Sequence, residues 1–164
     1  MTIRDAVEAD LPAIVAIYNS IIPGRVVTAD LEPVTVDSRR PWLAAHDSAR
    51  RPVWVAEDSR GVAGWLSFDT FYPRAAYDGT AMIALYVEEA RRRTGLGQLL
   101  LDRAVAKAPQ LGLHTLLGYV FAHNEPSLRF FAKNGFSRWA HLPRVALLDG
   151  VERDLIVLGR RLGA

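Results

Sequence analysis

The 164-residue sequence contains no cysteine. This absence excludes disulfide bonds, thiolate ligands for a metal and a cysteine nucleophile, because each of these needs a cysteine sulfur. A chain without cysteine also fits a reducing compartment, so we expect the protein to be cytoplasmic.

Long hydrophobic runs and clusters of lysine are also missing. No apolar run approaches the ~18 residues of a membrane span, and the opening residues 1–5 lack the apolar core of a signal peptide. Lys107 and Lys133 are the only lysines, every other basic residue is arginine, and the net charge is +2 without a polybasic tail. We therefore expect neither a membrane nor a nucleic acid as partner.

The histidines do not have the spacing of metal ligands. They are dispersed along the chain and share no short motif; they are His46, His114, His123 and His141. The sequence therefore predicts no metal site.

What the chain does contain is hydrophobic residues, which make up 50% of it. This composition is typical of a globular protein, and the length suffices for one domain with a hydrophobic core. Repeats, linkers and low-complexity segments are absent, so we expect a single domain over residues 1–164.

Hydrophobic periodicity and turn residues predict an α/β fold with a mixed sheet, part antiparallel hairpin and part parallel crossover. Asp10 is expected to cap the first helix, Asp58–Gly61 to form a hairpin turn, and Gly135 to end the last helix. The four tryptophans are expected in the core. Strands are expected at residues 3–6, 52–56, 62–68, 81–87, 114–121, 136–142 and 151–158. Helices are expected at residues 11–21, 37–46, 96–107 and 124–134.

The segment 92–97, Arg-Arg-Thr-Gly-Leu-Gly, follows the apolar strand 81–87 and precedes a helix. Glycines allow a ligand to approach the backbone, and a helix N-terminus presents free N–H groups that bind phosphate. A pyrophosphate cradle is one interpretation, and an ordinary strand-to-helix turn with solvated arginines is the other. The segment is neither a P-loop nor a good dinucleotide fingerprint, because its spacing and its place in the chain differ from both.

A second motif begins at Asn124 and ends at Phe136. Asn124 and Ser127 suit either the capping of a helix or hydrogen bonds to a ligand above its N-terminus. Lys133 suits either a phosphate contact or the end of the helix dipole.

Together, the two motifs resemble the GCN5-related N-acetyltransferase (GNAT) superfamily, whose acetyl-CoA signature matches Arg92-x-x-Gly95-x-Gly97. The chain is most similar to the phosphinothricin and methionine sulfoximine acetyltransferase branch. Segments that fit this branch are Ile17-Tyr18-Asn19, Thr28-Ala29-Asp30, Arg74-Ala75-Ala76-Tyr77, Tyr86-Val87 and Arg153-Asp154-Leu155. The resemblance covers essentially the whole chain and implies a GNAT fold, with about seven strands flanked by about four helices.

The resemblance also implies a cosubstrate site for acetyl-CoA and direct acetyl transfer to an amine, without an acyl-enzyme. Backbone groups of the strand would pair with the pantetheine arm, the turn and helix N-terminus would hold the pyrophosphate, and the second motif would contact the distal part of the cofactor. The residues so implied are Leu85, Tyr86, Val87, Arg92, Arg93, Thr94, Gly95, Leu96, Gly97, Gln98, Asn124, Ser127 and Lys133.

Both proton-transfer groups implied by the resemblance are missing. This chain has Met82 where the branch carries the glutamate taken as general base, Ala84 where it carries serine, and Phe131 where the superfamily often has a tyrosine acid. General acid–base catalysis typically contributes about 10²–10⁴-fold, so their loss predicts a slower enzyme and not an inactive one. The catalytic residues are therefore left unknown; candidate replacements are Tyr86, Glu88, Glu89 and His123.

The substrate side is expected in the aromatic loop before the central strand. By resemblance, Arg74 would pair with a substrate carboxylate, and its alternative is a surface arginine beside packed aromatics. Met82 would add an apolar wall. The expected substrate-binding residues are Phe71, Tyr72, Arg74, Tyr77 and Met82.

Three functions follow from these patterns. The first is a transferase, an acetyl-CoA-dependent N-acetyltransferase (acyltransferase) acting on a small amino-acid-like amine. The second is a degenerate domain that binds CoA without efficient turnover, and the third is a nucleotide-binding domain unrelated to acyl transfer. The resemblance and the apolar C-terminal strands also predict a homodimer.

Overall fold

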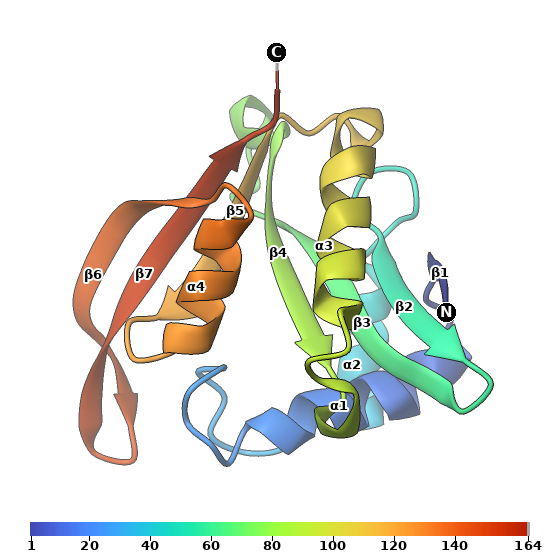
Figure 1. Ribbon diagram of the computed structural model, residues 1–164, viewed down its shortest axis with the longest axis horizontal. Coiled ribbons are helices and arrows are strands. Elements are labelled where there is room, and N and C mark those ends of the chain that lie inside the picture. Colours follow the sequence, from blue (N-terminus) through green and yellow to red (C-terminus); the bar gives the residue numbers. More distant parts are fainter. Residues whose placement is uncertain (164) are drawn as a thin grey trace.

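The computed structural model describes residues 1–163 and has a seven-stranded mixed sheet at its centre, in the order β1-β2-β3-β4-β5-β7-β6 (Figure 1). Only the β4–β5 pair is parallel. The strands are β1 (Thr2–Asp5), β2 (Val53–Asp58), β3 (Gly61–Thr70), β4 (Thr80–Val87), β5 (Thr115–Phe121), β6 (Ser137–Leu148) and β7 (Val151–Arg161). The expected mixed α/β sheet is thereby confirmed.

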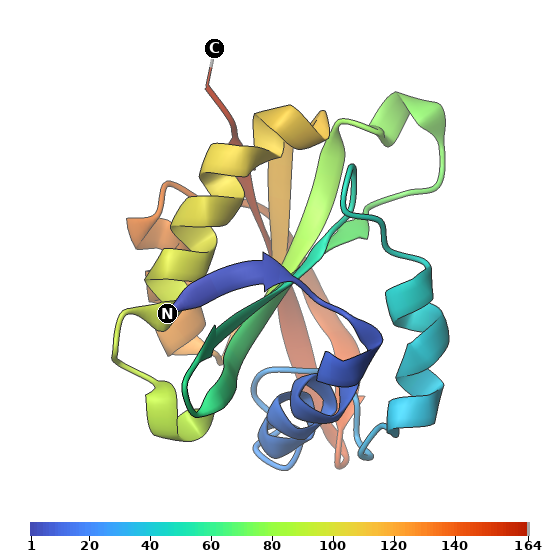
Figure 2. The ribbon, with the colours of Figure 1, turned by 90° about the vertical axis from the view of Figure 1, so that its right-hand side faces the viewer.

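Helices cover both faces of the sheet, and Figure 2 shows α2 and α3 on opposite sides of it. The α-helices are α1 (Leu11–Ile21), α2 (Val36–Ala44), α3 (Leu96–Lys107) and α4 (Glu125–Lys133). Short 3₁₀ turns, which the sequence did not predict, are η1 (Glu8–Asp10), η2 (Ala75–Tyr77), η3 (Glu89–Arg91) and η4 (Ala108–Leu111). Among the described residues, no helix is both long and apolar enough to cross a membrane.

The two faces of the sheet bury separate hydrophobic clusters. One cluster packs α3 against Leu66, Phe68 and Ile83. The other packs α1 against Val55 and Trp65 on the opposite face. Successive strand residues point to opposite faces, which is why neighbours such as Trp65 and Leu66 belong to different clusters. β2, β3 and β5 contain runs of residues that are buried on both faces, as their continuous apolar sequences require.

The parallel pair β4–β5 is short, and this shapes the site. Their pairing joins Thr80–Met82 to Thr115–Leu117 and includes no later residue of either strand. Beyond Met82 the strands diverge, and Figure 1 shows the opening between them widening toward α1. The carboxyl half of β4 therefore borders open space where a paired strand would otherwise lie.

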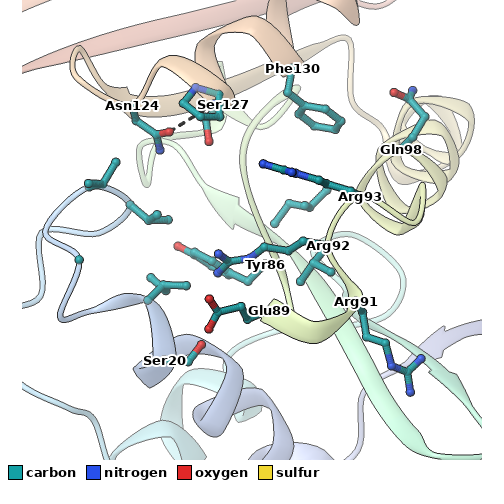
Figure 3. Close-up of a pocket in the computed structure, with 18 of the residues that line it drawn as sticks. Ser20, Tyr86, Glu89, Arg91, Arg92, Arg93, Gln98, Asn124, Ser127 and Phe130 are labelled. Carbon is teal, nitrogen blue, oxygen red and sulfur yellow. Dashed lines mark hydrogen bonds between the residues drawn. The ribbon is translucent and has the colours of Figure 1, made fainter.

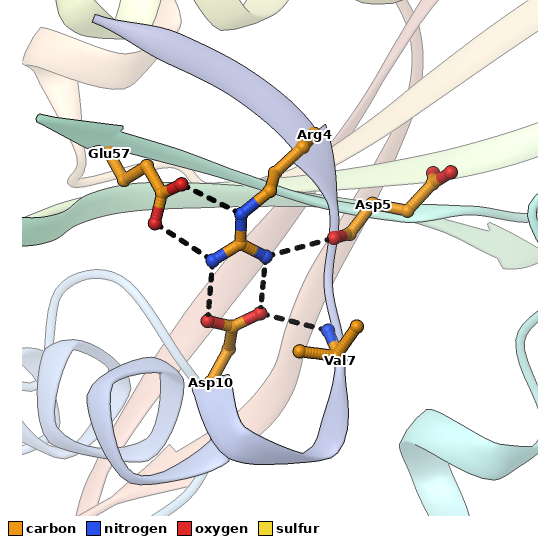
Figure 4. Close-up of polar contacts among 5 residues, drawn as sticks. All are labelled: Arg4, Asp5, Val7, Asp10 and Glu57. Atoms are coloured by element: carbon orange, nitrogen blue, oxygen red, sulfur yellow. Dashed lines mark hydrogen bonds and ion pairs between the residues drawn. The ribbon is translucent and has the colours of Figure 1, made fainter.

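Asp10 lies at the N-cap position of α1, immediately before Leu11, but its side chain makes no capping hydrogen bond to this helix. It accepts hydrogen bonds instead from Arg4, at 2.7 and 2.9 Å, and from the backbone N–H of Val7 at 2.8 Å (Figure 4). Arg4 also makes a bidentate contact with Glu57 at 2.8 Å for each bond. The expected capping role was wrong because a stronger, charged partner takes the carboxylate. This network joins β1, β2 and η1.

The expected ends of two strands and the expected burial of one tryptophan also need correction. β3 continues to Thr70, into the expected aromatic loop, and β6 extends to Leu148 because the β6–β7 pairing continues to the hairpin turn after that residue. Trp54 and Trp65 are buried, but Trp139 is 47% exposed, since it lies on the outer strand of the sheet. Gly135 follows α4 in the left-handed conformation, as expected.

Candidate functional site

The turn between β4 and α3 has an unusual backbone. Arg93 has a φ of 62° and Gly95 a φ of 87°, both in the left-handed region. Turns of this kind direct successive N–H groups into one concavity, which binds anions. Arg93 is not glycine, so its conformation is strained, and such strain clusters at functional sites.

Helix α3 starts directly after this turn, and among residues 1–163 no side chain caps its N-terminus. By contrast, Thr35 caps α2 and Asn124 caps α4. The first N–H groups of α3 therefore lack the partners that helix ends normally obtain. They are available, with the positive end of the helix dipole, for a ligand anion.

The three consecutive arginines of the turn have different roles. Arg91 points back to Asp58, with contacts of 2.7 and 3.1 Å, and its side chain is largely buried. Arg92 and Arg93 project toward the cleft (Figure 3). Arg91 fastens the turn to β2, and the next two arginines supply positive charge to the cleft.

A cleft of about 760 Å³ lies in front of this turn. Three parts of the chain form its walls: the end of β4 with the turn and α3, the beginning of α4, and the end of α1 with the loop after it. Its lining residues are Ser20, Ile21, Gly24, Val26, Val27, Leu85, Tyr86, Val87, Glu89, Arg91, Arg92, Arg93, Gly95, Gly97, Gln98, Asn124, Pro126, Ser127 and Phe130.

Asn124 both caps α4 and lines the cleft. Its Oδ1 accepts a hydrogen bond from the backbone N–H of Ser127 at 3.3 Å. The side-chain amide Nδ2 has no hydrogen-bond partner within residues 1–163, and Asn124 lines the cleft although it is only 5% exposed. The capping interpretation of Asn124 is confirmed, and a free donor remains for a ligand.

A second cleft, of about 500 Å³, continues from the first. Both clefts share Val27, Leu85, Tyr86, Asn124, Ser127 and Phe130. The second cleft extends along β4 to Met82, reaches Asp69 on the neighbouring β3, and is otherwise mainly apolar. A long ligand in the first cleft can therefore present its end to a small molecule in the second cleft. The two clefts meet beside Leu85 and Tyr86.

Tyr86 belongs to β4, and its side chain lies between the sheet and α1 at the junction of the two clefts. Its ring packs against Trp65 at 4.7 Å and edge-on against Tyr18 at 5.4 Å between centroids. Burial raises the pKa of Tyr86 well above its usual range, and the nearby Tyr18 and Asp69 raise it further. The phenol therefore stays protonated at neutral pH, so Tyr86 can donate a hydrogen bond but does not serve as a base.

Similarity to known protein families and structures agrees with this geometry. Residues 14–136 match the sequence profile of the acetyltransferase (GNAT) family. The chain belongs to this family. Its expected class, N-acetyltransferase, and its expected cosubstrate, acetyl-CoA, are those of the family and are confirmed.

Three relatives illustrate how close the similarity is. A Bacillus subtilis (strain 168) protein provisionally named a phosphinothricin acetyltransferase is 50% identical over 163 residues, with 99% of each chain covered. The L-methionine sulfoximine/L-methionine sulfone acetyltransferase of Pseudomonas aeruginosa is 32% identical, covering 94% of this chain and 90% of its own. The structure of a Salmonella typhimurium protein provisionally named an acetyltransferase, with its cofactor acetyl-CoA, has a TM-score of 0.92 at 30% identity, covering 100% and 95%.

Most residues expected at the cosubstrate site line the first cleft of this acetyltransferase. Three do not. Thr94 turns its hydroxyl to the carbonyl of Arg91 at 2.7 Å, Leu96 is buried in the core, and Lys133 lies in the last turn of α4. Leu96 still contributes its backbone N–H to the first turn of α3. The contacts of all these residues with acetyl-CoA stay predictions.

The expected substrate residues divide into two groups. Met82 lines the second cleft. Phe71, Tyr72, Arg74 and Tyr77 line neither cleft and pack on one another, with the Arg74 guanidinium 5.8 Å from the Tyr72 ring centroid. Arg74 thus has the surroundings of the surface alternative, and its role in substrate binding stays a prediction.

Of the catalytic candidates, Tyr86 and Glu89 line the first cleft. Glu88 is 3.6 Å from Arg91 and lines neither cleft. His123 stacks on Phe121, with 5.4 Å between centroids, and its Nε2 donates to the carbonyl of Arg25 at 2.9 Å. Phe131 lines the second cleft as an apolar wall, so it supplies no proton there.

Sequence reasoning missed Asp69 in the second cleft and the residues that hold it. Its Oδ1 lies 3.0 Å from His46 Nε2, and its Oδ2 accepts from the Ser67 hydroxyl at 2.7 Å. The signal that could have indicated Asp69 is the apolar strand sequence Trp-Leu-Ser-Phe-Asp at residues 65–69. Its serine and aspartate are two residues apart and therefore share one face of the strand. Within residues 1–163, no cluster of side chains forms a metal site.

Proposed function

We propose that this acetyltransferase transfers acetyl from acetyl-CoA directly to the amine of a small amino-acid-like substrate. The observation that carries the proposal is the junction of the two clefts at Leu85 and Tyr86. One cleft has the anion cradle that a CoA pyrophosphate needs, and the other has the size of a small acceptor.

The site fits CoA in charge and in space. Arg92, Arg93 and the uncapped N-terminus of α3 complement the phosphates. A Cβ added at Gly97 would stand within 4 Å of Leu85, Val87 and Phe130, so a larger side chain there would enter the cleft. The unpaired edge of β4 presents backbone groups to the pantetheine arm.

The acceptor class rests on relatives and on the second cleft. The named substrates of relatives are phosphinothricin, L-methionine sulfoximine and L-methionine sulfone, all small amines with acidic or polar side groups. Met82 makes one wall apolar where the resemblance implies a carboxylate. We propose that the acceptor is an amino acid or close analogue whose side chain packs on Met82.

Thermal unfolding with and without ligands tests the cosubstrate. A ligand at 100 times its Kd adds about 2.7 kcal/mol to the free energy of unfolding, so millimolar acetyl-CoA should raise Tm clearly. ATP and NAD serve as matched controls. No shift with acetyl-CoA, or a larger shift with ATP or NAD, would overturn the proposal.

Thiol release across amino acids, methionine sulfone, methionine sulfoximine, phosphinothricin and polyamines tests turnover. We expect release with the amino-acid analogues. Silence across this set, together with tight CoA binding, would support the alternative of a degenerate domain that binds CoA without turnover. Loss of turnover in Arg74→Ala, with acetyl-CoA binding retained, would assign Arg74 to substrate binding.

We also propose that the protein is a cytoplasmic homodimer. The location rests on the cysteine-free sequence. The dimer rests on exposed apolar side chains of the β6–β7 hairpin, which are Trp139, Val145, Leu147 and Val151. Light scattering behind a sizing column tests it: a dimer that Leu147→Glu converts to a monomer is expected, and a wild-type monomer at all concentrations would contradict it.

A further inference from the structure

Asp69 and Met82 are directly opposite each other in the antiparallel pairing of β3 and β4. Opposite residues of two paired strands point to the same face and lie about 5 Å apart. Both line the second cleft. The Asp69 side chain is 29% exposed. A carboxylate therefore does reach the second cleft, but it comes from β3, whereas the resemblance implied one on β4 at the position of Met82.

Asp69 is held from two sides. Ser67, two residues earlier on the same face of β3, donates its hydroxyl to Oδ2 at 2.7 Å. His46, which follows α2, places Nε2 at 3.0 Å from Oδ1, and its side chain is 10% exposed. Each carboxylate oxygen keeps a further lone pair for a group in the cleft.

The hydrogen bonds of His46 determine where its protons lie. Nδ1 is 2.8 Å from the carbonyl oxygen of Trp42, which can only accept, so Nδ1 carries a hydrogen. In the neutral ring, Nε2 then turns a lone pair toward the Asp69 carboxylate. Two acceptors 3.0 Å apart need a proton between them, so the neutral ring has a strong tendency to gain one.

We propose that Asp69 and His46 together accept the proton of the substrate ammonium. This inference rests on the proposed function. In the step, an N–H bond of the ammonium breaks and its electron pair stays on nitrogen. The proton forms an O–H bond at Asp69 Oδ1, directly or through one water, and this O–H bond then breaks as the same proton moves to His46 Nε2. The products are a neutral amine, an imidazolium and an unchanged carboxylate, so charge and atoms balance.

The surroundings of His46 favour its protonated form. Burial lowers the pKa of His46, but the hydrogen bonds to Asp69 and to the Trp42 carbonyl outweigh it and leave that pKa raised. A base whose pKa is near the working pH is the most effective one. His46 is the positioning and proton-storing residue, and Asp69 is the one that faces the acceptor.

Four other titratable groups near Asp69 and His46 do not supply the same proton acceptor. The pKa values of Tyr86 and Tyr18 are raised, chiefly by burial, so both phenols stay neutral. Asp30 accepts from Tyr18 and lies 3.7 Å from Arg39. Asp47, next to His46, accepts from the backbone N–H groups of Ala49 and Arg50.

The test measures kcat/KM against pH with the best acceptor for wild type, Asp69→Asn and His46→Gln. Asp78→Asn is the matched control, because Asp78 is an exposed aspartate that pairs with Arg50 and lines neither cleft. We expect Asp69→Asn to lower kcat/KM by about 10²-fold. In wild type the rate should rise with pH as His46 loses its proton, and His46→Gln should remove this rise, leaving only that of the substrate ammonium.

The Tm shift caused by acetyl-CoA shows that each variant is folded. The double variant Asp69→Asn/Met82→Glu returns a carboxylate to the same face of the cleft, and we expect it to recover at least about tenfold of the lost rate. If Asp69→Asn stays within about threefold of wild type, with an unchanged pH profile, the inference is overturned while the acetyltransferase function stands. A double variant without recovery, despite a full acetyl-CoA shift, also counts against it. A wild type without turnover removes the proposed function itself.

Discussion

Gly97 on α3 faces Leu85 on β4 so closely that a Cβ at residue 97 would lie 3.6 Å from Leu85 Cδ2. This is an ordinary van der Waals contact for one methyl group. Both residues line the first cleft, so a longer side chain at residue 97 would extend into it.

Gly97→Leu should therefore block acetyl-CoA. Its side chain would occupy the space between Leu85, Val87 and Phe130, and we expect the Kd for acetyl-CoA to rise at least about tenfold, or 1.4 kcal/mol. Gly97→Ala is the matched control, and its added methyl is expected to leave Kd within about threefold. Calorimetric titration measures both. Equal binding by Gly97→Leu and wild type would place CoA elsewhere.

Arg93 offers a test that separates charge from backbone strain. Both Arg93→Ala and Arg93→Gly lose the guanidinium, and we expect each to weaken acetyl-CoA binding about tenfold, because a charged hydrogen bond contributes about 1.5–3 kcal/mol. Only glycine relieves the left-handed conformation, so Arg93→Gly should be about 1 kcal/mol more stable than Arg93→Ala. Titration and chemical denaturation measure the two effects. If Arg129→Ala, an exposed control on α4 that pairs with Glu125, weakens binding equally, the Arg93 contact is excluded.

Asn124 has two roles that two variants can separate. Asn124→Asp keeps the oxygen that caps α4 and loses the amide donor, whereas Asn124→Ala loses both. Both variants should raise the KM for acetyl-CoA, and only alanine should also cost about 1 kcal/mol of stability. A variant Asn124→Asp with wild-type KM would show that Asn124 acts only as a cap.

Asp10 should make the protein sensitive to acid. The hydrogen bonds from Arg4 hold the pKa of Asp10 below its usual value, and the backbone N–H of Val7 adds to this. A carboxylate with a lowered folded pKa stabilises the protein above its unfolded pKa of about 3.9, and this contribution is lost as pH falls through the folded value. We expect Asp10→Asn to reduce the free energy of unfolding by about 2 kcal/mol at pH 7 and by less at pH 3. Denaturation at both pH values tests this, and an equal loss at both would contradict the ionic origin.

The turn and uncapped helix start between β4 and α3 were predictable because their signal is local. A strand, a glycine-containing turn and a helix start follow one another within residues 81–98, and the positions that Arg92, Gly95 and Gly97 occupy follow from this order. For Lys133, the motif left open a phosphate contact and a role at the end of the helix dipole, and the resemblance implied a contact with the distal part of the cofactor. In the structure it ends α4 on the exposed surface, since helix length and not motif spacing determines where it points.

The second cleft was much less predictable, because it depends on pairing between distant segments. His46 and Asp69 are 23 residues apart, and their contact arises when the segment after α2 packs beside β3. The register that places Asp69 opposite Met82 also follows from the whole β3–β4 hairpin. A sequence pattern shows that a carboxylate is missing at Met82, but it does not show which neighbouring strand supplies one. Trp139 was wrongly expected in the core for a similar reason, since its exposure depends on β6 being the edge strand.

The most direct measurement follows both products of one reaction. Purified protein is incubated with acetyl-CoA and methionine sulfoximine, and the released thiol and the N-acetylated amine are quantified together, with Gly97→Leu as control. The account predicts equal amounts of thiol and N-acetyl product in wild type and at least about tenfold less of both in Gly97→Leu at limiting acetyl-CoA. Thiol release without an N-acetylated product, for this acceptor and for the other amino-acid analogues, would contradict it.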